Sequence, residues 1–148
     1  MKYRLLTIIG RIIGNLIVVL LLMTILLNVF GLIVLGTVEG PSMEPLFQTG
    51  DLVVIIKSDE INVGDIIIFK KKAGDGFIIH RVIEIRNISN SLYYVTKGDN
   101  NVLPDYQEFE VAGVPSHRVI GKVLEINGLP LKIPLIGYLP LMARKLFS

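Results

Sequence analysis

A serine, a histidine and an aspartate, the residue types that together support nucleophilic chemistry, occur in distinctive local contexts in this chain. Ser42 lies in a segment that Gly40, Pro41 and Pro45 keep out of regular secondary structure. A serine hydroxyl becomes a good nucleophile only when a neighbouring base accepts its proton. Taken alone, Ser42 is more simply interpreted as an ordinary turn serine, so a base must be identified.

His80 is the preferred candidate for that base. It interrupts the apolar run Phe77–Ile85, which has the composition of a strand. With an unperturbed pKa of about 6.5, a histidine is mostly neutral at pH 7 and can accept a proton from a hydroxyl. His117, in a predicted loop beside Pro115, is the competing base. The alternative for His80 itself is a structural histidine in a strand.

Two aspartates could orient such a histidine, because an orienting acid accepts a hydrogen bond from one ring nitrogen and stabilises the imidazolium. Asp99 lies between Gly98 and Asn100, in a sequence that forms turns in any protein. Asp105 follows Pro104 and has a weaker local structural role. On the residues alone, either aspartate fits.

The composition points to a membrane protein. Hydrophobic residues make up 51% of the 148 residues, charged residues only 19%, and the mean hydropathy is +0.61. The net charge of +2 does not favour nucleic-acid binding. With no cysteine and two histidines, the chain has neither a disulfide nor the ligands of a thiolate or three-histidine metal centre. We therefore expect no metal and no other cofactor.

An uncharged run from residue 12 to residue 38 predicts one transmembrane helix. At about 1.5 Å per residue it spans roughly 40 Å, more than the hydrocarbon core. A cleavable signal peptide is the rival interpretation, but its apolar region is usually shorter. Residues 1–11 are basic, with Lys2, Arg4 and Arg11, which predicts a cytoplasmic N-terminus and an external domain.

Residues 39–128 change to short apolar runs separated by Gly-Asp pairs, which indicate strands and turns. We expect strands near Leu52–Lys57, Ile66–Lys70, Phe77–Ile85, Leu92–Lys97 and Val119–Ile126. The predicted fold class is mainly β, as one small β domain, a barrel or a folded sheet, behind one N-terminal transmembrane helix.

The tail, residues 129–148, is apolar but contains Pro130, Pro134 and Pro140. These prolines argue against a second membrane-spanning helix. An interfacial segment, with Arg144 and Lys145 near anionic headgroups, is the preferred prediction. Packing against the β domain is the alternative.

Together these features resemble the signal peptidase I family, of the archaeal and endoplasmic-reticulum type. The resemblance rests on an N-terminal anchor followed, in family order, by four motifs, Gly40-Pro41-Ser42-Met43-Glu44-Pro45, Gly64-Asp65-Ile66-Ile67-Ile68-Phe69, His80-Arg81-Val82 and Lys97-Gly98-Asp99-Asn100-Asn101. In the bacterial type, a lysine stands at the position of His80.

The resemblance implies a role for each candidate residue. Ser42 would be the nucleophile, His80 the general base and Asp105 the third member, with Asp99 as the alternative. Many relatives carry a serine where this chain has Gly40, and its hydroxyl can stabilise the oxyanion. Here the backbone N–H of Ser42 is the expected oxyanion donor.

The function implied by the resemblance is that of a membrane-anchored serine endopeptidase, which removes signal peptides from exported preproteins at the outer face of a cell or endoplasmic-reticulum membrane. Its expected partners are signal-peptide-bearing preproteins and the lipid bilayer, not nucleic acid, and a complex with other membrane subunits stays open. The resemblance also implies small side chains at the first and third substrate positions before the cut. Two alternatives are a non-catalytic membrane-tethered β module and a relative of the self-cleaving repressor-type serine peptidases.

Overall fold

The structure is a computed structural model that describes residues 2–30, 33–139 and 142. The chain divides into two compact units, Met1–Val34 and Leu35–Ser148. The first contains the helix and the second the β-sheet that carries the candidate site residues. Each unit is described by itself.

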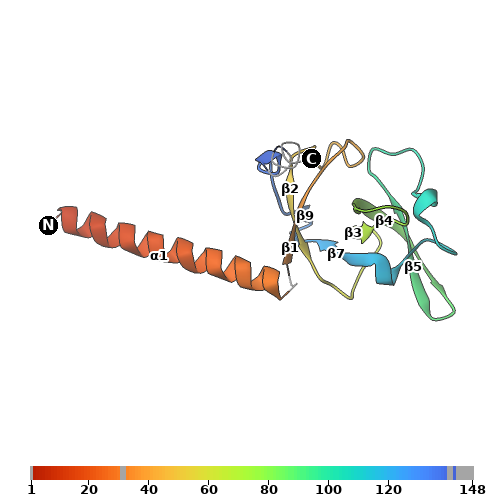
Figure 1. Cartoon of the computed structure of the whole chain (residues 1–148), viewed down its shortest axis with the longest axis horizontal. Helices are drawn as coiled ribbons and strands as arrows, with labels where there is room; N and C mark the ends of the chain where they lie inside the picture. The colour runs from red at the N-terminus through yellow and green to blue at the C-terminus, as the bar shows by residue number, and fades with distance from the viewer. Residues whose placement is uncertain (1, 31–32, 140–141, 143–148) are drawn as a thin grey trace. The chain divides into compact units, whose positions relative to one another are not determined.

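Helix α1 extends over Lys2–Val29 (Figure 1). Its segment Thr7–Leu26, with a mean hydropathy of 2.4, is long and apolar enough to cross a membrane. Helix α1 differs in its bounds from the run predicted for residues 12–38, and its crossing of a membrane stays a prediction. It begins earlier because its basic residues are good helix formers. It ends earlier because Ile33–Thr37 form strand β1, whose β-branched residues suit a sheet.

The β unit is built around an eight-stranded sheet in the order β1-β2-β7-β3-β4-β5-β6, with β10 also paired to β2. A separate hairpin joins β8 to β9, and two short 3₁₀ helices, η1 and η2, flank β6. The strands after β1 are β2 (Leu52–Ile56), β3 (Ile66–Lys70), β4 (Phe77–Ile88), β5 (Ser91–Lys97), β6 (Val114–Pro115), β7 (Val119–Val123), β8 (Glu125–Ile126), β9 (Leu129–Pro130) and β10 (Lys132–Ile133), and the 3₁₀ helices are η1 (Tyr106–Glu108) and η2 (Ser116–Arg118).

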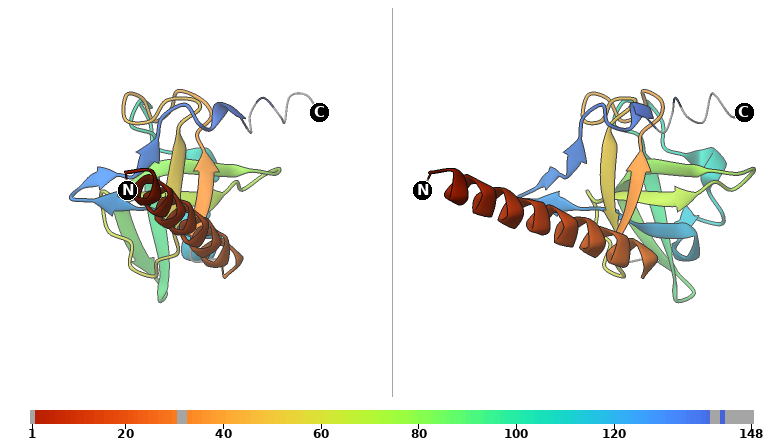
Figure 2. Two further views of the ribbon diagram at one scale, coloured as in Figure 1. Left: turned by 90° about the vertical axis from the view of Figure 1, so that its left-hand side faces the viewer. Right: turned by 60° about the vertical axis from the view of Figure 1, so that its left-hand side comes forward.

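The mainly β fold class is confirmed, and of the two predicted forms the sheet is the folded one. Within the described residues the strand order does not close into a barrel. Figure 2 shows strands of this sheet running in different directions, as in a strongly twisted sheet. All five predicted strand regions contain strands, but the last is divided into β7 and β8. The division arises because Asn127 and Gly128, both at positive φ, form a tight turn that pairs β8 with β9.

The beginning of the tail belongs to the β unit, so the predicted boundary after residue 128 needs correction. Strand β10 pairs with β2 at Lys132↔Val53, and the Gly137 N–H donates to the Gly50 carbonyl over 2.9 Å. Packing against the β domain, the alternative prediction, holds for this part because β2 offers unpaired backbone groups there. Arg144 and Lys145 lie outside the described residues.

The core lies along the central strands. Strand β3 is buried from Ile66 to Phe69, between β4 and β7. One cluster of buried side chains joins β3, β4, β5 and β6, and its members are Ile67, Phe69, Val82, Tyr94 and Val114. This packing fixes β4 and β5, the strands next to which the candidate site forms.

Candidate active site

His80 lies on β4, opposite Ile67 of β3, and is largely buried. Its two ring nitrogens contact the other candidates. His80 Nδ1 lies 2.7 Å from Asp105 Oδ2, and His80 Nε2 lies 3.0 Å from Ser42 Oγ. Both distances are hydrogen-bonding distances. The structure therefore brings Ser42, His80 and Asp105 together, with the imidazole between the hydroxyl and the carboxylate.

Ser42 lies in the segment between β1 and β2, which is fixed by buried side chains and by hydrogen bonds from the loop after β5. Met43 and Phe47 point into the core and are almost fully buried. The N–H of Asn100 donates to the Ser42 carbonyl over 2.9 Å, and its side-chain amide donates to the Pro41 carbonyl over 3.1 Å. In Figure 1 this orange segment and the one that follows β5 lie at the same end of the β unit. The backbone at Ser42 is thus fixed by buried side chains of its own segment and by two hydrogen bonds from Asn100.

The Ser42 backbone N–H is available to donate a hydrogen bond to an oxyanion. Within the described part of the chain it donates to no protein acceptor, whereas the Gly40 N–H donates to Thr49 Oγ1 over 3.0 Å. Pro41 has no N–H to offer. Of the amides from Gly40 to Ser42, only that of Ser42 is free to face an oxyanion.

Asp105 lies between β5 and η1 and is buried, with 1% of its surface exposed. Its N–H donates to the Thr96 carbonyl over 2.9 Å. Its Oδ2 accepts a second hydrogen bond from Thr96 Oγ1 at 2.7 Å. A buried carboxylate needs such donors to remain ionised.

Asp99 has a different partner. Its carboxylate binds the Arg81 guanidinium through both oxygens, at 2.8 Å from Nε and 2.7 Å from Nη2. Arg81 also donates to the Gly64 carbonyl over 2.8 Å. Asp99 therefore connects the loop after β5 to the turn before β3, and Asp105 alone of the two aspartates contacts His80.

Gly98 lies at a point of close approach. A Cβ at this position would lie 2.5 Å from the Ser42 carbonyl oxygen and 2.9 Å from His80 Nε2. Real Cβ atoms do not approach backbone oxygen so closely. The glycine before Asp99 is thus required by the site geometry itself.

His117, the competing base, lies on η2 and is exposed. No described hydrogen bond joins it to Ser42 or to an aspartate. The geometry favours His80 as the partner of Ser42.

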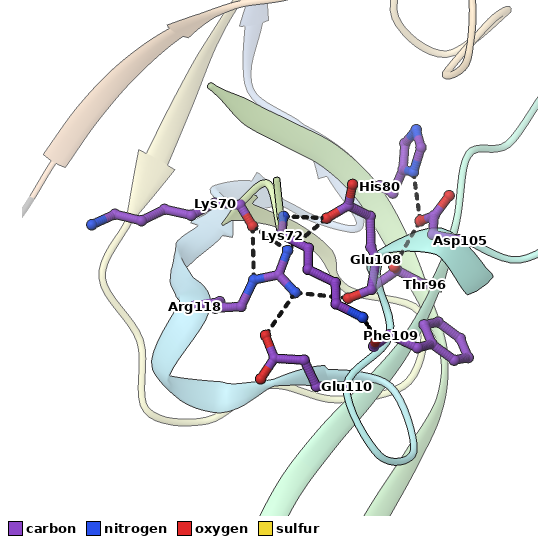
Figure 3. A network of polar contacts seen from close by, with 9 residues as sticks. All are labelled: Lys70, Lys72, His80, Thr96, Asp105, Glu108, Phe109, Glu110 and Arg118. Atoms are coloured by element: carbon purple, nitrogen blue, oxygen red, sulfur yellow. Dashed lines mark hydrogen bonds and ion pairs between the residues drawn. The ribbon is translucent and has the colours of Figure 1, made fainter. Parts of the chain in front are cut away.

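A buried ion-pair network lies beside the site, and the sequence analysis missed it. Arg118 on η2 donates to Glu108 Oε2 and to the Lys70 carbonyl, each at 2.6 Å from Nη2 (Figure 3). Its Nη1 donates to the Glu108 carbonyl at 2.7 Å and to Glu110 Oε1 at 3.2 Å. The Lys72 N–H also donates to Glu108 Oε2, at 2.6 Å. These contacts fix η1, the 3₁₀ helix that directly follows Asp105.

A second ion pair, of the buried Asp51 with the partly exposed Lys132, connects the tail to the serine segment. Lys132 Nζ lies 2.8 Å from Asp51 Oδ2 and donates to the Leu46 carbonyl over 2.7 Å. Burial raises the pKa of Asp51, but hydrogen bonds from Lys132 and the Gln48 N–H outweigh it and leave that pKa below its usual value. A lone lysine in an apolar tail was the only sequence signal of this contact.

Known proteins share these segments. A family model described as peptidase S24-like matches residues 31–124, a range that contains Ser42, His80 and Asp105. The human signal peptidase complex catalytic subunit SEC11C is 41% identical over 85 residues, covering 51% of this chain and 44% of that protein.

Two fungal proteins match over longer stretches. The signal peptidase complex catalytic subunit SEC11 of Chaetomium globosum is 31% identical over 106 residues, covering 68% of this chain and 58% of that protein. The corresponding subunit of Debaryomyces hansenii is 30% identical over 103 residues, covering 68% and 60%. The chain thus spans about half the length of the curated relatives it matches.

Proposed function

Because the chain belongs to the peptidase S24-like family, and to the signal peptidase I type within it, we propose that it is a serine endopeptidase that removes signal peptides from exported preproteins. The observation that carries this proposal is the position of His80, within hydrogen-bonding distance of both Ser42 Oγ and Asp105 Oδ2. A buried histidine between a hydroxyl and a carboxylate is the arrangement that activates a serine.

The proposed reaction has two stages. Ser42 Oγ attacks the carbonyl carbon of the scissile peptide while His80 Nε2 takes the hydroxyl proton, and Asp105 stabilises the imidazolium. The tetrahedral intermediate collapses when His80 gives that proton to the leaving amine, which departs with the mature protein. Water, deprotonated by His80, then attacks the acyl ester. The second intermediate collapses when His80 returns that proton to the leaving Ser42 Oγ, which releases the signal peptide and restores the enzyme.

The developing oxyanion is stabilised in this proposal by the Ser42 N–H. Gly40 supplies no hydroxyl at the position where many relatives carry a serine. An unpaired backbone N–H aimed at the new negative charge is the usual substitute.

The membrane is proposed to bring enzyme and substrate together. Helix α1 would span the bilayer once, with basic residues Lys2, Arg4 and Arg11 on the cytoplasmic side. A membrane-inserted signal peptide would then share the bilayer to which the chain tethers the β unit.

Substrate alignment is proposed to use the sheet edge. Strand β1 is at one end of the strand order and leads directly into the Ser42 segment. An extended substrate could add to such an edge through backbone hydrogen bonds, with alternate side chains entering small pockets. Since the relatives are named as subunits of signal peptidase complexes, a complex with other membrane subunits is part of the proposal.

The test is cleavage of a purified preprotein by the full chain in detergent, with N-terminal sequencing of the product. We expect cleavage at the signal-peptide junction, none with His80→Ala, and near wild-type rates with His117→Ala. His80→Lys should be mostly inactive, since a lysine needs strong desolvation before it can act as a base. Absence of cleavage by the wild type would favour the non-catalytic β module, and cleavage of the chain itself alone would favour the repressor-type alternative.

A further inference from the structure

Asp105 Oδ2 accepts hydrogen bonds from two strands at once. His80 Nδ1 on β4 and Thr96 Oγ1 on β5 each lie 2.7 Å from it (Figure 3). Thr96 is completely buried. Because an ionised carboxylate only accepts hydrogen bonds, the Thr96 hydroxyl must donate. One threonine hydroxyl and one imidazole thus share a single carboxylate oxygen.

Thr96 also holds the backbone of Asp105. The Thr96 carbonyl accepts a hydrogen bond from the Asp105 N–H at 2.9 Å. The backbone and the carboxylate of Asp105 are therefore both bound to Thr96. Thr96 pairs with Val82 in the β4–β5 ladder, two positions along β4 from His80. Asp105 itself belongs to no strand. Its orientation therefore depends on a residue that the sheet fixes relative to His80.

We propose that Thr96 is a positioning residue of the active site, whose hydroxyl fixes the Asp105 carboxylate in the orientation that directs His80 toward Ser42. The proposal rests on the proposed function, because it assigns a part to Thr96 in that same reaction. Thr96 acts through Asp105, and no described hydrogen bond joins it to Ser42 or His80.

Loss of this hydroxyl has two physical consequences. The carboxylate keeps its hydrogen bond to His80 Nδ1 but loses the contact that fixes its orientation relative to β5, so the imidazole is held less accurately toward Ser42, and kcat falls. The shared oxygen also loses a competing donor, which strengthens its bond to the His80 Nδ1–H and favours the imidazolium. The acidic limb of the pH–rate profile, which reports on the base, should then move to higher pH.

The other charges around His80 are already paired and stay in place in such a variant. They lie on β4, β5, β7 and the adjoining loops, and they are Arg81 with Asp99, Lys97 with the Asn101 carbonyl, and Lys122 with Asp65. A change in His80 titration would therefore report on the Thr96–Asp105 contact.

The experiment compares Thr96→Val, which removes the hydroxyl at similar volume, with Thr96→Ser, which keeps it. The matched control is Tyr94→Phe, which removes the hydroxyl of another buried residue of β5 that makes no described hydrogen bond to Asp105. The readouts are kcat and the acidic limb of the pH profile for preprotein cleavage, and an NMR titration of the imidazoles in the full chain. His117, the other of the two histidines, is the internal reference.

For Thr96→Val we expect kcat to fall about 10- to 100-fold, and the acidic limb of the pH profile and the His80 NMR titration to move to higher pH. Thr96→Ser should restore both, and His117 should not move. If Thr96→Val does not fold, Thr96→Cys, with its weak thiol donor, should give a smaller change in the same direction.

An unchanged His80 titration in every folded variant that lacks the hydroxyl would overturn the proposal. Because the titration needs no turnover, it tests Thr96 even if the wild type cleaves no preprotein. Absence of preprotein cleavage by the wild type would instead count against the proposed function.

Discussion

The Asp105 carboxylate lies 2.7 Å from His80 Nδ1, although 25 positions separate the two residues along the chain. The closer aspartate in the sequence, Asp99, binds Arg81 instead. The structure thus separates two acids that have similar sequence contexts.

The first prediction uses that separation. Asp105→Asn removes the charge that stabilises the imidazolium at constant volume, so kcat should fall roughly 1,000-fold or more while the melting temperature changes little. Asp99→Asn weakens a partly exposed ion pair away from His80 and should keep much of the activity. Turnover and thermal unfolding of both variants check this. Loss of turnover in Asp99→Asn alone, at unchanged stability, would transfer the role to Asp99.

The second prediction concerns Gly98. Gly98→Ala places a methyl group 2.5 Å from the Ser42 carbonyl oxygen and 2.9 Å from His80 Nε2, so one of these groups must move. Because Gly98 is not at positive φ, alanine brings no backbone strain, and the effect should be on kcat, by roughly 100-fold, rather than on folding. Preprotein cleavage and circular dichroism test it, and wild-type turnover would mean that the close approach is not needed for catalysis.

A feature of this structure can be predicted from the sequence when the residues that determine it are close together along the chain. Strand β3 and the positions of Ser42 and His80 follow from local patterns. Strand β1 does not, because Ile33, Val34 and Leu35 are as apolar as the helix before them and periodicity cannot separate a short apolar strand from a helix.

The long-range polar contacts were beyond local patterns as well. Arg118 reaches the Lys70 carbonyl across 48 positions, and Lys132 reaches Asp51 across 81. Nothing in the neighbouring residues of either cation indicates its partner. Asp105 was preferred over Asp99 by family resemblance, whereas its contact with Thr96 depends on how β4 and β5 pair.

The third prediction concerns Arg118, whose guanidinium serves Glu108, Glu110 and the Lys70 carbonyl. Arg118→Met leaves a buried carboxylate without its partner and should lower the free energy of unfolding by about 3 kcal/mol. Tyrosine fluorescence in a denaturant titration measures this. The control is Arg86→Met, which breaks a more exposed pair with Glu84 and should change stability much less. Equal effects of the two substitutions would argue against a structural role for the buried network.

The fourth prediction concerns pH and Asp51, whose pKa is below its usual value in the folded chain. A depressed pKa stabilises the folded state above the unfolded-state pKa of about 4, and this stabilisation is lost as the pH falls through the folded-state pKa. Asp51→Asn should therefore be less stable than wild type at pH 7, and the difference should narrow below about pH 4. Denaturant titrations across this range measure it. Asp59→Asn, at an exposed position, is the control, and a gap that widens in acid would contradict the assignment.

In the proposed reaction Ser42 is a nucleophile activated by His80, and single-turnover cleavage of a preprotein by Ser42→Ala is the decisive measurement. The substitution removes the attacking oxygen and leaves the contacts that Asn100 makes to the backbone of this segment. If Ser42 is the nucleophile, Ser42→Ala gives no cleavage product above the uncatalysed background and keeps the wild-type melting temperature. Cleavage by Ser42→Ala at the wild-type rate would contradict it.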